Sequence, residues 1–281
     1  MNPSKLLPLL ASLCLSLPAC AGTVASSDDA PAPAGASSTA PASATTADWS
    51  CAGPSAATAT QPHPAALGPQ DTLTVHLVEA YSHSGVGGVT VLACDAADTA
   101  CSSPLARAQA DDEGQATMTI PGASGFFDGY LAITGPEMPT NLAFFDGRTS
   151  KKDSMVMASP FFEVVVYTPV ALGITATLGG VTLDPARGVL RTEVHDCGGR
   201  LASGVSVGLS TSDQATQIAY FASNGGALAP GASATDETGV AIAFGVPESG
   251  FAVREALGAT AVGGAFGLAR AGAVSSVVAL P

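Results

Sequence analysis

Residues 88–94 read Gly-Val-Thr-Val-Leu-Ala-Cys, and this run decides the fold together with the residues that follow it to Tyr130. After a small loop to Cys101, polar residues lead to Asp-Asp-Glu-Gly at 111–114 and then to Ala-Thr-Met-Thr-Ile at 116–120. Short alternating runs separated by Asp- and Gly-rich turns are typical of β-strands joined by tight turns. The sequence therefore predicts an all-β fold.

A second copy of this pattern lies near the C-terminus. Residues 204–207 read Gly-Val-Ser-Val, and residues 235–244 repeat the turn and strand of residues 111–120. Gly239 stands 125 residues after Gly114, the matching turn glycine. Matched residue types in matched order predict a duplicated β module.

The first 19 residues have the pattern of a signal peptide. Lys5 supplies a positive charge, and residues 6–17 form an apolar run too short to span a membrane. The run ends in Leu17-Pro18-Ala19-Cys20, which resembles the lipobox of bacterial lipoproteins. This resemblance implies cleavage before Cys20 and acylation of that cysteine. An ordinary secretory signal cut after Ala21 is the alternative, because the residues before that bond also fit the A-x-A pattern.

Residues 20–67 consist mainly of Ala, Ser, Thr and Pro. Such a segment cannot bury enough apolar surface to offset the entropy lost on ordering, so we predict a disordered tether. An Asp after the cysteine would resemble the signal for inner-membrane retention. Ala21 stands there instead, so we expect the outer membrane of a Gram-negative bacterium as the destination.

The chain is acidic, with a formal net charge of −13. Loss of the leader removes Lys5 and no acid, which gives about −14 for the mature chain. An acidic surface without a basic cluster argues against binding to nucleic acid and to anionic lipid headgroups.

The part after the tether is long enough for two β domains of about 100 residues each. We predict a first antiparallel β-sandwich over residues 68–168 and a second over residues 188–281. Residues 169–187 connect them. Thr168 suits an N-cap and Pro169 a first helical position, which predicts a short helix over residues 170–178.

Four cysteines remain once Cys14 leaves with the leader and Cys20 is acylated. An exported protein meets an oxidising compartment, so we predict two disulfides among these cysteines. The pairing Cys94–Cys101 is favoured because the ends of a short loop between two strands lie close together. That leaves Cys51–Cys197, which would attach the end of the tether, with Trp49, to the second domain. The spacing contains no zinc motif.

The Gly-Val-x-Val strand, the Asp- and Gly-containing hairpin and the terminal strand carry a resemblance over residues 73–281. They look like the carboxypeptidase regulatory-like, transthyretin-like (prealbumin-like) β-sandwich domain. Two copies behind a lipobox look like tandem-sandwich lipoproteins of Gram-negative bacteria. The resemblance implies no catalytic residues, because the family domain accompanies some carboxypeptidases without contributing to peptide cleavage.

One motif suggests catalysis and is rejected. Residues 204–208, Gly-Val-Ser-Val-Gly, match the G-x-S-x-G nucleophile elbow, which requires a strand, a sharp turn and a helix around the serine. Ser206 lies inside an alternating strand, and its counterpart in the first copy is Thr90. We also expect His195, beside Cys197, to be a surface histidine. No cofactor and no metal site are predicted.

Aromatic residues are the best candidates for a binding surface. We name Phe126, Phe127 and Tyr130 as the possible surface, because the Phe126-Phe127 doublet occurs only in the first copy; Tyr220-Phe221 form a further pair. We expect a non-enzymatic, lipid-anchored envelope protein that serves as a structural, adhesion or partner-binding module, with a protein or glycan partner. A carbohydrate-binding surface lipoprotein is the alternative, and a hydrolase using Ser206 a distant third.

Overall fold

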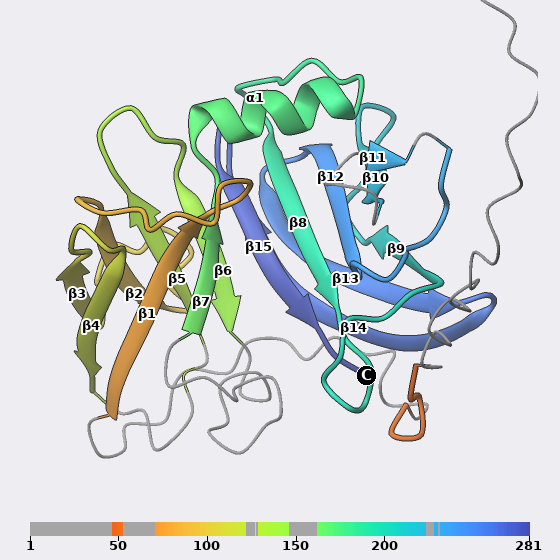
Figure 1. The fold of residues 1–281 in the computed structure, drawn as a ribbon, viewed down its shortest axis with the longest axis horizontal. Helices are drawn as coiled ribbons and strands as arrows, with labels where there is room; N and C mark the ends of the chain where they lie inside the picture. The colour runs from red at the N-terminus through yellow and green to blue at the C-terminus, as the bar shows by residue number, and fades with distance from the viewer. Residues whose placement is uncertain are drawn as a thin grey trace, which may run out of the picture. The chain divides into compact units, whose positions relative to one another are not determined.

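A computed structural model gives the fold of the chain (Figure 1). The residues that it describes are 47–52, 71–121, 127, 129–145, 162–222, 228–229 and 231–281. The predicted signal peptide, the lipidation site Cys20 and most of the predicted tether lie outside them. Within the described residues there are fifteen β-strands and one α-helix, so the all-β prediction is confirmed.

The first module begins with a three-stranded sheet. Strand β1 (Asp71–Glu79) pairs with β4 (Gln115–Ile120) in antiparallel and with β7 (Phe162–Val166) in parallel orientation. Burial alternates along β4, so Ala116 and Met118 face the interior while the threonines between them face solvent. One face of this sheet is therefore apolar and needs a partner.

The partner is a second sheet whose strands run β6-β5-β2-β3 and are all antiparallel. Its strands are β2 (Thr90–Asp95), β3 (Ala106–Gln109), β5 (Gly129–Thr134) and β6 (Asn141–Phe145). Residues from both sheets form one apolar cluster, including Leu77, Val91 and Leu131. The first module is thus a β-sandwich.

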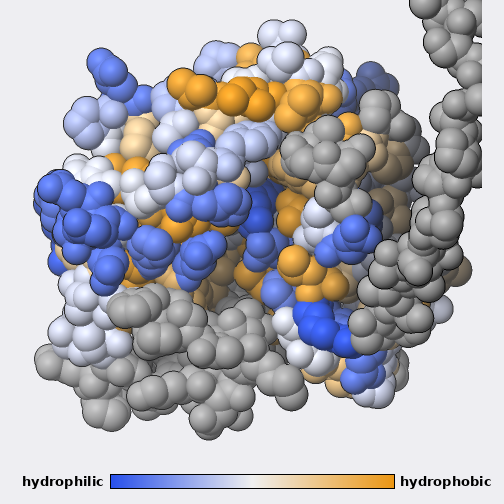
Figure 2. Space-filling model, in the orientation of Figure 1, coloured by the Kyte–Doolittle hydropathy of each residue, from blue (hydrophilic) through white to orange (hydrophobic). Residues whose placement is uncertain are grey.

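The predicted connecting helix is present as α1 (Pro169–Leu178). The Thr168 hydroxyl accepts a hydrogen bond from the Ala171 N–H at 3.1 Å, which satisfies one of the free donors at the helix start. One side of α1 packs through Ala171 and Ala176 against apolar residues of the second module, among them Val189 and Phe244. The other side exposes Val170, Ile174 and Leu178, and Figure 2 shows the hydrophobic surface over this helix.

The second module repeats the first pairing pattern. Strand β8 (Gly188–Val194) pairs in antiparallel with β12 (Val240–Val246) and in parallel with β15 (Val274–Ala279). Strands β10 (Gln217–Phe221) and β11 (Leu228–Ala229) extend this sheet beyond β12.

The opposite sheet of the second module has the order β14-β13-β9. Its strands are β9 (Val205–Leu209), β13 (Ser249–Leu257) and β14 (Thr260–Ala269). Leu190, Val253 and Val277 belong to the apolar cluster between the two sheets, which is therefore the core of a second β-sandwich.

A single sheet of nine strands runs through both modules, because β6 pairs in parallel with β15. By their contacts Thr45–Pro281 form one unit. The prediction of purely antiparallel sandwiches is wrong in this detail: the pairs β1–β7, β8–β15 and β6–β15 are parallel. Parallel neighbours need a crossover connection, and the last strand of each module reaches the first strand by such a route.

Candidate functional site

The N-terminal segment, residues 47–52, is docked on the second module. The disulfide Cys51–Cys197 joins the two with a Cα–Cα distance of 5.7 Å. The Cys197 N–H donates to the Asp48 carbonyl oxygen at 2.8 Å, and Trp49 packs against the core of the second sandwich. The predicted Cys51–Cys197 pairing is confirmed. The prediction of a disordered tether is wrong for these six residues, because the disulfide, this hydrogen bond and the indole contact fix them.

Asp196 organises this attachment. Its carboxylate accepts hydrogen bonds from the Asp48 N–H at 2.9 Å, from the Gly198 and Arg200 N–H groups, and from the Arg200 side chain at 2.7 Å. Burial alone would raise the pKa of Asp196, but these donors outweigh it and lower the pKa to about 2. The carboxylate is therefore ionised and firmly held at neutral pH.

The second predicted disulfide, Cys94–Cys101, is also confirmed and closes a loop with a Cα–Cα distance of 5.3 Å. Beneath this disulfide loop the Tyr130 hydroxyl donates to the Asp98 carbonyl oxygen at 2.6 Å. Arg270 of the second module donates to the Tyr130 hydroxyl at 2.8 Å and to the Thr99 carbonyl oxygen. Tyr130 thus connects the disulfide loop to the second module.

The predicted aromatic binding surface is wrong for two of its three residues. Tyr130 is fully buried, and its ring stacks on Phe144 with centroids 5.1 Å apart. Phe127 is only 5% exposed and packs in the core of the first sandwich. Both rings are more stable against other apolar side chains than in water, which is why they point inward. Phe126 lies outside the described residues.

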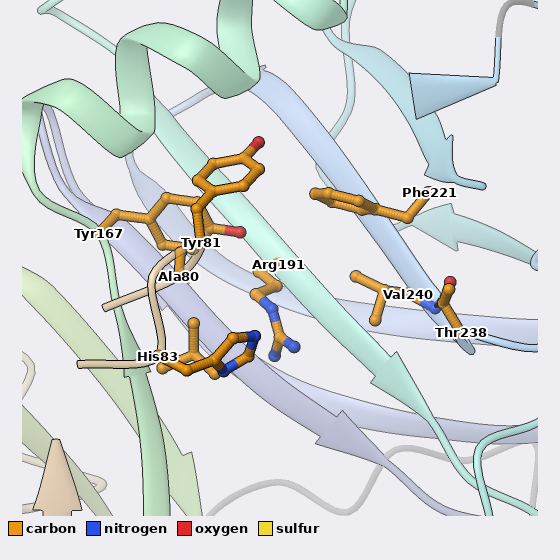
Figure 3. A pocket seen from close by; sticks show the side chains of 9 residues that line it. Ala80, Tyr81, His83, Tyr167, Arg191, Phe221, Thr238 and Val240 are labelled. Atoms are coloured by element: carbon orange, nitrogen blue, oxygen red, sulfur yellow. Dashed lines mark hydrogen bonds between the residues drawn. The ribbon is translucent and has the colours of Figure 1, made fainter. Parts of the chain in front are cut away.

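A pocket of about 370 Å³ opens at the junction of the two modules (Figure 3). We call it the junction pocket. Its lining residues are Ala80, Tyr81, His83, Val165, Tyr167, Arg191, Phe221, Thr238 and Val240. In Figure 3 the rings of Tyr81 and Phe221 lie on opposite sides of Arg191. The first module supplies one wall and the second module supplies the other wall and Arg191.

The first-module wall is a turn held by Glu79. The Glu79 carboxylate accepts from the Tyr81 N–H at 3.0 Å, and from the Ser82 N–H at 2.7 Å and hydroxyl at 2.8 Å. Burial would raise the pKa of Glu79, but these hydrogen bonds lower it. The turn places His83 at a φ of 52°, and the Tyr81 hydroxyl shares a 2.8 Å hydrogen bond with Thr175 of α1. This wall is therefore fixed from two sides.

Arg191, on the floor of the junction pocket, forms an ion pair with Glu193. Arg191 Nη2 lies 2.6 Å from Glu193 Oε1, and the Arg191 side chain is only 12% exposed. The attraction of Arg191 holds the pKa of Glu193 well below its usual range, while burial raises the pKa of Tyr167 to about 12. Arg191 and Tyr167 line the pocket, so at neutral pH its floor presents a guanidinium that is already paired with Glu193, and a neutral phenol.

His195 continues this polar row and is not the surface residue that we expected. It is 9% exposed, its Nδ1 lies 3.1 Å from the Gly199 carbonyl oxygen, and its Nε2 lies 3.8 Å from Glu193 Oε2. Burial opposes its charged form, but the nearby Glu193 carboxylate, the Gly199 carbonyl oxygen and Asp196 together outweigh that effect and raise the pKa of His195. The alternation of Arg191, Glu193 and His195 was the available sequence signal, because residues two apart in a strand share a face.

Ser206 lies inside β9, as predicted, and donates to the Ala256 carbonyl oxygen at 3.1 Å. A serine in a strand lacks the sharp turn that exposes a nucleophile. Among the described residues no group of three or more His, Cys, Asp or Glu side chains could hold a metal ion. The helix in the described part of the chain is too short to cross a membrane.

Comparisons with known proteins give little beyond this geometry. No protein-family model matches the chain, and no curated protein is similar to it in sequence. Among solved structures, the shaft pilin SpaA from Lactobacillus rhamnosus GG is 12% identical over 75% of this chain and 98% of its own, with a TM-score of 0.23. A streptococcal ancillary pilin is 13% identical over 75% and 69%, with a TM-score of 0.22. Similarity at these TM-scores supports no conclusion about shared fold or function.

Proposed function

We propose that the protein is a non-enzymatic, lipid-anchored module of the cell envelope that binds a partner or supports an envelope structure. The observation that carries this proposal is the covalent docking of the N-terminal segment through Cys51–Cys197. A disulfide at this position fits an exported chain, and residues 21–46 would link it to an acylated Cys20. The outer membrane of a Gram-negative bacterium is the proposed location.

The non-enzymatic part of the proposal is supported by the environment of Ser206. Its hydroxyl is used inside a sheet, in a hydrogen bond to a backbone carbonyl, and a strand context does not activate a serine. The role of the two sandwiches is then to present surfaces. The transthyretin-like resemblance of residues 73–281 fits such a role and remains part of the proposal.

Membrane fractionation of a Gram-negative host tests the anchor. The full chain is expressed with Cys20→Ala, and with Cys14→Ala as the matched control, because Cys14 lies in the leader that is removed. We expect the wild type and Cys14→Ala in the membrane fraction and Cys20→Ala displaced from it. Equal membrane retention of all three proteins would contradict lipid anchoring.

Intact mass spectrometry separates the two routes of processing. An acylated chain that begins at Cys20 supports the proposal, whereas an unmodified chain that begins at Gly22 shows an ordinary secretory signal. The same sample is alkylated without reductant. The two disulfides predict no alkylated thiol among Cys51, Cys94, Cys101 and Cys197, and four alkylated thiols would contradict both.

A further inference from the structure

The junction pocket is lined by Arg191, one member of a largely buried ion pair that stability alone does not explain. Arg191 and Glu193 lie on the face of β8 opposite the second core, to which Leu190 and Val194 point. Removing two charges from water costs free energy that their attraction only partly returns, and apolar replacements are often at least as stable. A pair in this position, beneath a pocket with aromatic walls, is better explained by a ligand that uses it.

The walls restrict the shape of that ligand. Tyr81 and Phe221 face the pocket from opposite modules, and Figure 3 shows Arg191 between them. The face of an aromatic ring carries partial negative charge and attracts weakly positive hydrogens. The C–H groups on the two faces of a sugar ring provide such hydrogens. The volume of about 370 Å³ lies at the small end of the range for ligand sites, which suits one or two ring units.

The floor restricts the charge of the ligand. Arg191 and Glu193 already neutralise each other at 2.6 Å, so the floor offers guanidinium donors but little net charge. An anion would have to compete with Glu193 for the guanidinium, and a zwitterion would have to separate the pair. A hydroxyl group can accept a hydrogen bond from the guanidinium without separating the pair.

We propose that the junction pocket binds a neutral, hydroxyl-rich ring, a hexose unit of an envelope glycan, between Tyr81 and Phe221 and over Arg191, whose charge Glu193 neutralises. This inference rests on the proposed binding role and gives it a ligand class. The Glu79-held turn keeps Tyr81 and His83 in place before the ligand arrives, which lowers the entropy lost on binding.

Ligand-observed NMR with the detergent-solubilised mature chain tests this inference. The probes are glucose, galactose, mannose and N-acetylglucosamine, with glucuronate as an anionic ring and glycine as a zwitterion. We expect saturation transfer to at least one neutral hexose with a Kd on the order of 1 mM, a weak affinity for a single ring. Glucuronate and glycine are expected to bind at least about tenfold more weakly, a difference of about 1.4 kcal/mol.

Two phenylalanines give a matched pair of variants. Phe221→Leu keeps apolar volume in the pocket but removes the ring face, and should weaken hexose binding about fivefold or more. Phe266→Leu makes the same change on β14, away from the pocket, and should leave binding unchanged. Tyr81→Phe keeps the ring and should also bind. Circular dichroism of each variant reports whether it is folded.

Three results would overturn the inference: absence of transfer to every neutral hexose, tighter binding of glucuronate or glycine, or unchanged hexose binding in a folded Phe221→Leu protein. The anchoring experiment is independent of these results, because membrane retention does not involve the junction pocket. Failure of the glycan inference is therefore distinguishable from failure of the proposed anchor.

Discussion

The two modules share one strand pattern but differ in the pairing of one strand, which is β3 in the first module and β10 in the second. The order β4-β1-β7 in the first module and β12-β8-β15 in the second have the same directions. In the first module β3 pairs with β2 on the opposite sheet, whereas in the second β10 pairs with β12. This change widens the sheet that carries Arg191 and brings Phe221 onto the same face.

The comparison shows how a duplicated fold acquires a site. The residues common to both copies are turns and core positions, which maintain a sandwich. The junction pocket instead uses residues that differ between copies: the turn at Tyr81, the charged row on β8 and Phe221 on the displaced β10. Four predictions test the roles of the shared and unshared features.

The largest difference is expected between the two disulfides. Cys51–Cys197 spans 146 residues and Cys94–Cys101 spans 7. In the chain-entropy model the double alanine variants lose about 5 and about 2 kcal/mol of the free energy of unfolding, respectively. Urea unfolding measures both. Equal losses would mean that the long bond does not restrict the unfolded chain as expected.

Matched turn glycines come next. A Cβ at Gly114, with φ of +86°, would lie 2.5 Å from the Leu77 carbonyl oxygen, and at Gly239 2.9 Å from the Val194 carbonyl oxygen. Gly88 also has a positive φ, but its Cβ would meet nothing within 4 Å. We expect losses of about 3, 2 and 1 kcal/mol for G114A, G239A and G88A, since the first two add a clash to left-handed strain. Chemical denaturation measures the series, and a larger loss in G88A than in G114A would contradict it.

Acid should weaken the second module through Asp196. Its pKa is lowered on folding to about 2, so its stabilising effect is present above about pH 4 and is lost as the pH falls toward 2. Over this range the wild type should lose about 2 kcal/mol of its free energy of unfolding. Asp196→Asn should show no such loss, because this variant lacks the carboxylate at every pH. Unfolding free energies at pH 7, 4 and 2.5 give the comparison. The same pH slope in both proteins would refute this role for Asp196.

The smallest effect is expected at the link between the modules. Tyr130→Phe removes the hydroxyl that bonds the Asp98 carbonyl oxygen and accepts from Arg270, and should cost about 1 kcal/mol. Thermal unfolding measures this loss of stability. Arg270→Gln serves as the second variant, and the two changes should be less than additive because they remove one shared contact.

The sequence was informative where local chemistry determines structure. The alternation in residues 115–120, the N-cap at Thr168 and the spacing of Cys94 and Cys101 each depend on neighbours along the chain, and all have the predicted outcome. The repeat of turn glycines likewise anticipated the repeated strand pairing.

The candidate site was less predictable because its residues meet only in the folded chain. Tyr81 and Phe221 are 140 positions apart, and nothing local indicates that β10 joins the sheet of β8. The choice of Phe127 and Tyr130 failed for a related reason. An aromatic residue in a strand faces either core or solvent, and only the opposing sheet and Arg270 decide which.

The Cys51–Cys197 bond also sets the path of mechanical force. A pull on the chain before Cys51 reaches the end of β8 through the disulfide and bypasses the 146-residue span that contains the whole first module. While the bond is intact, force along the backbone would not pass through the first module, which would be loaded only through the pairing of β6 with β15. Reduction would add that span to the loaded length, so single-molecule stretching should show the unfolding step of the first module only in the presence of reductant.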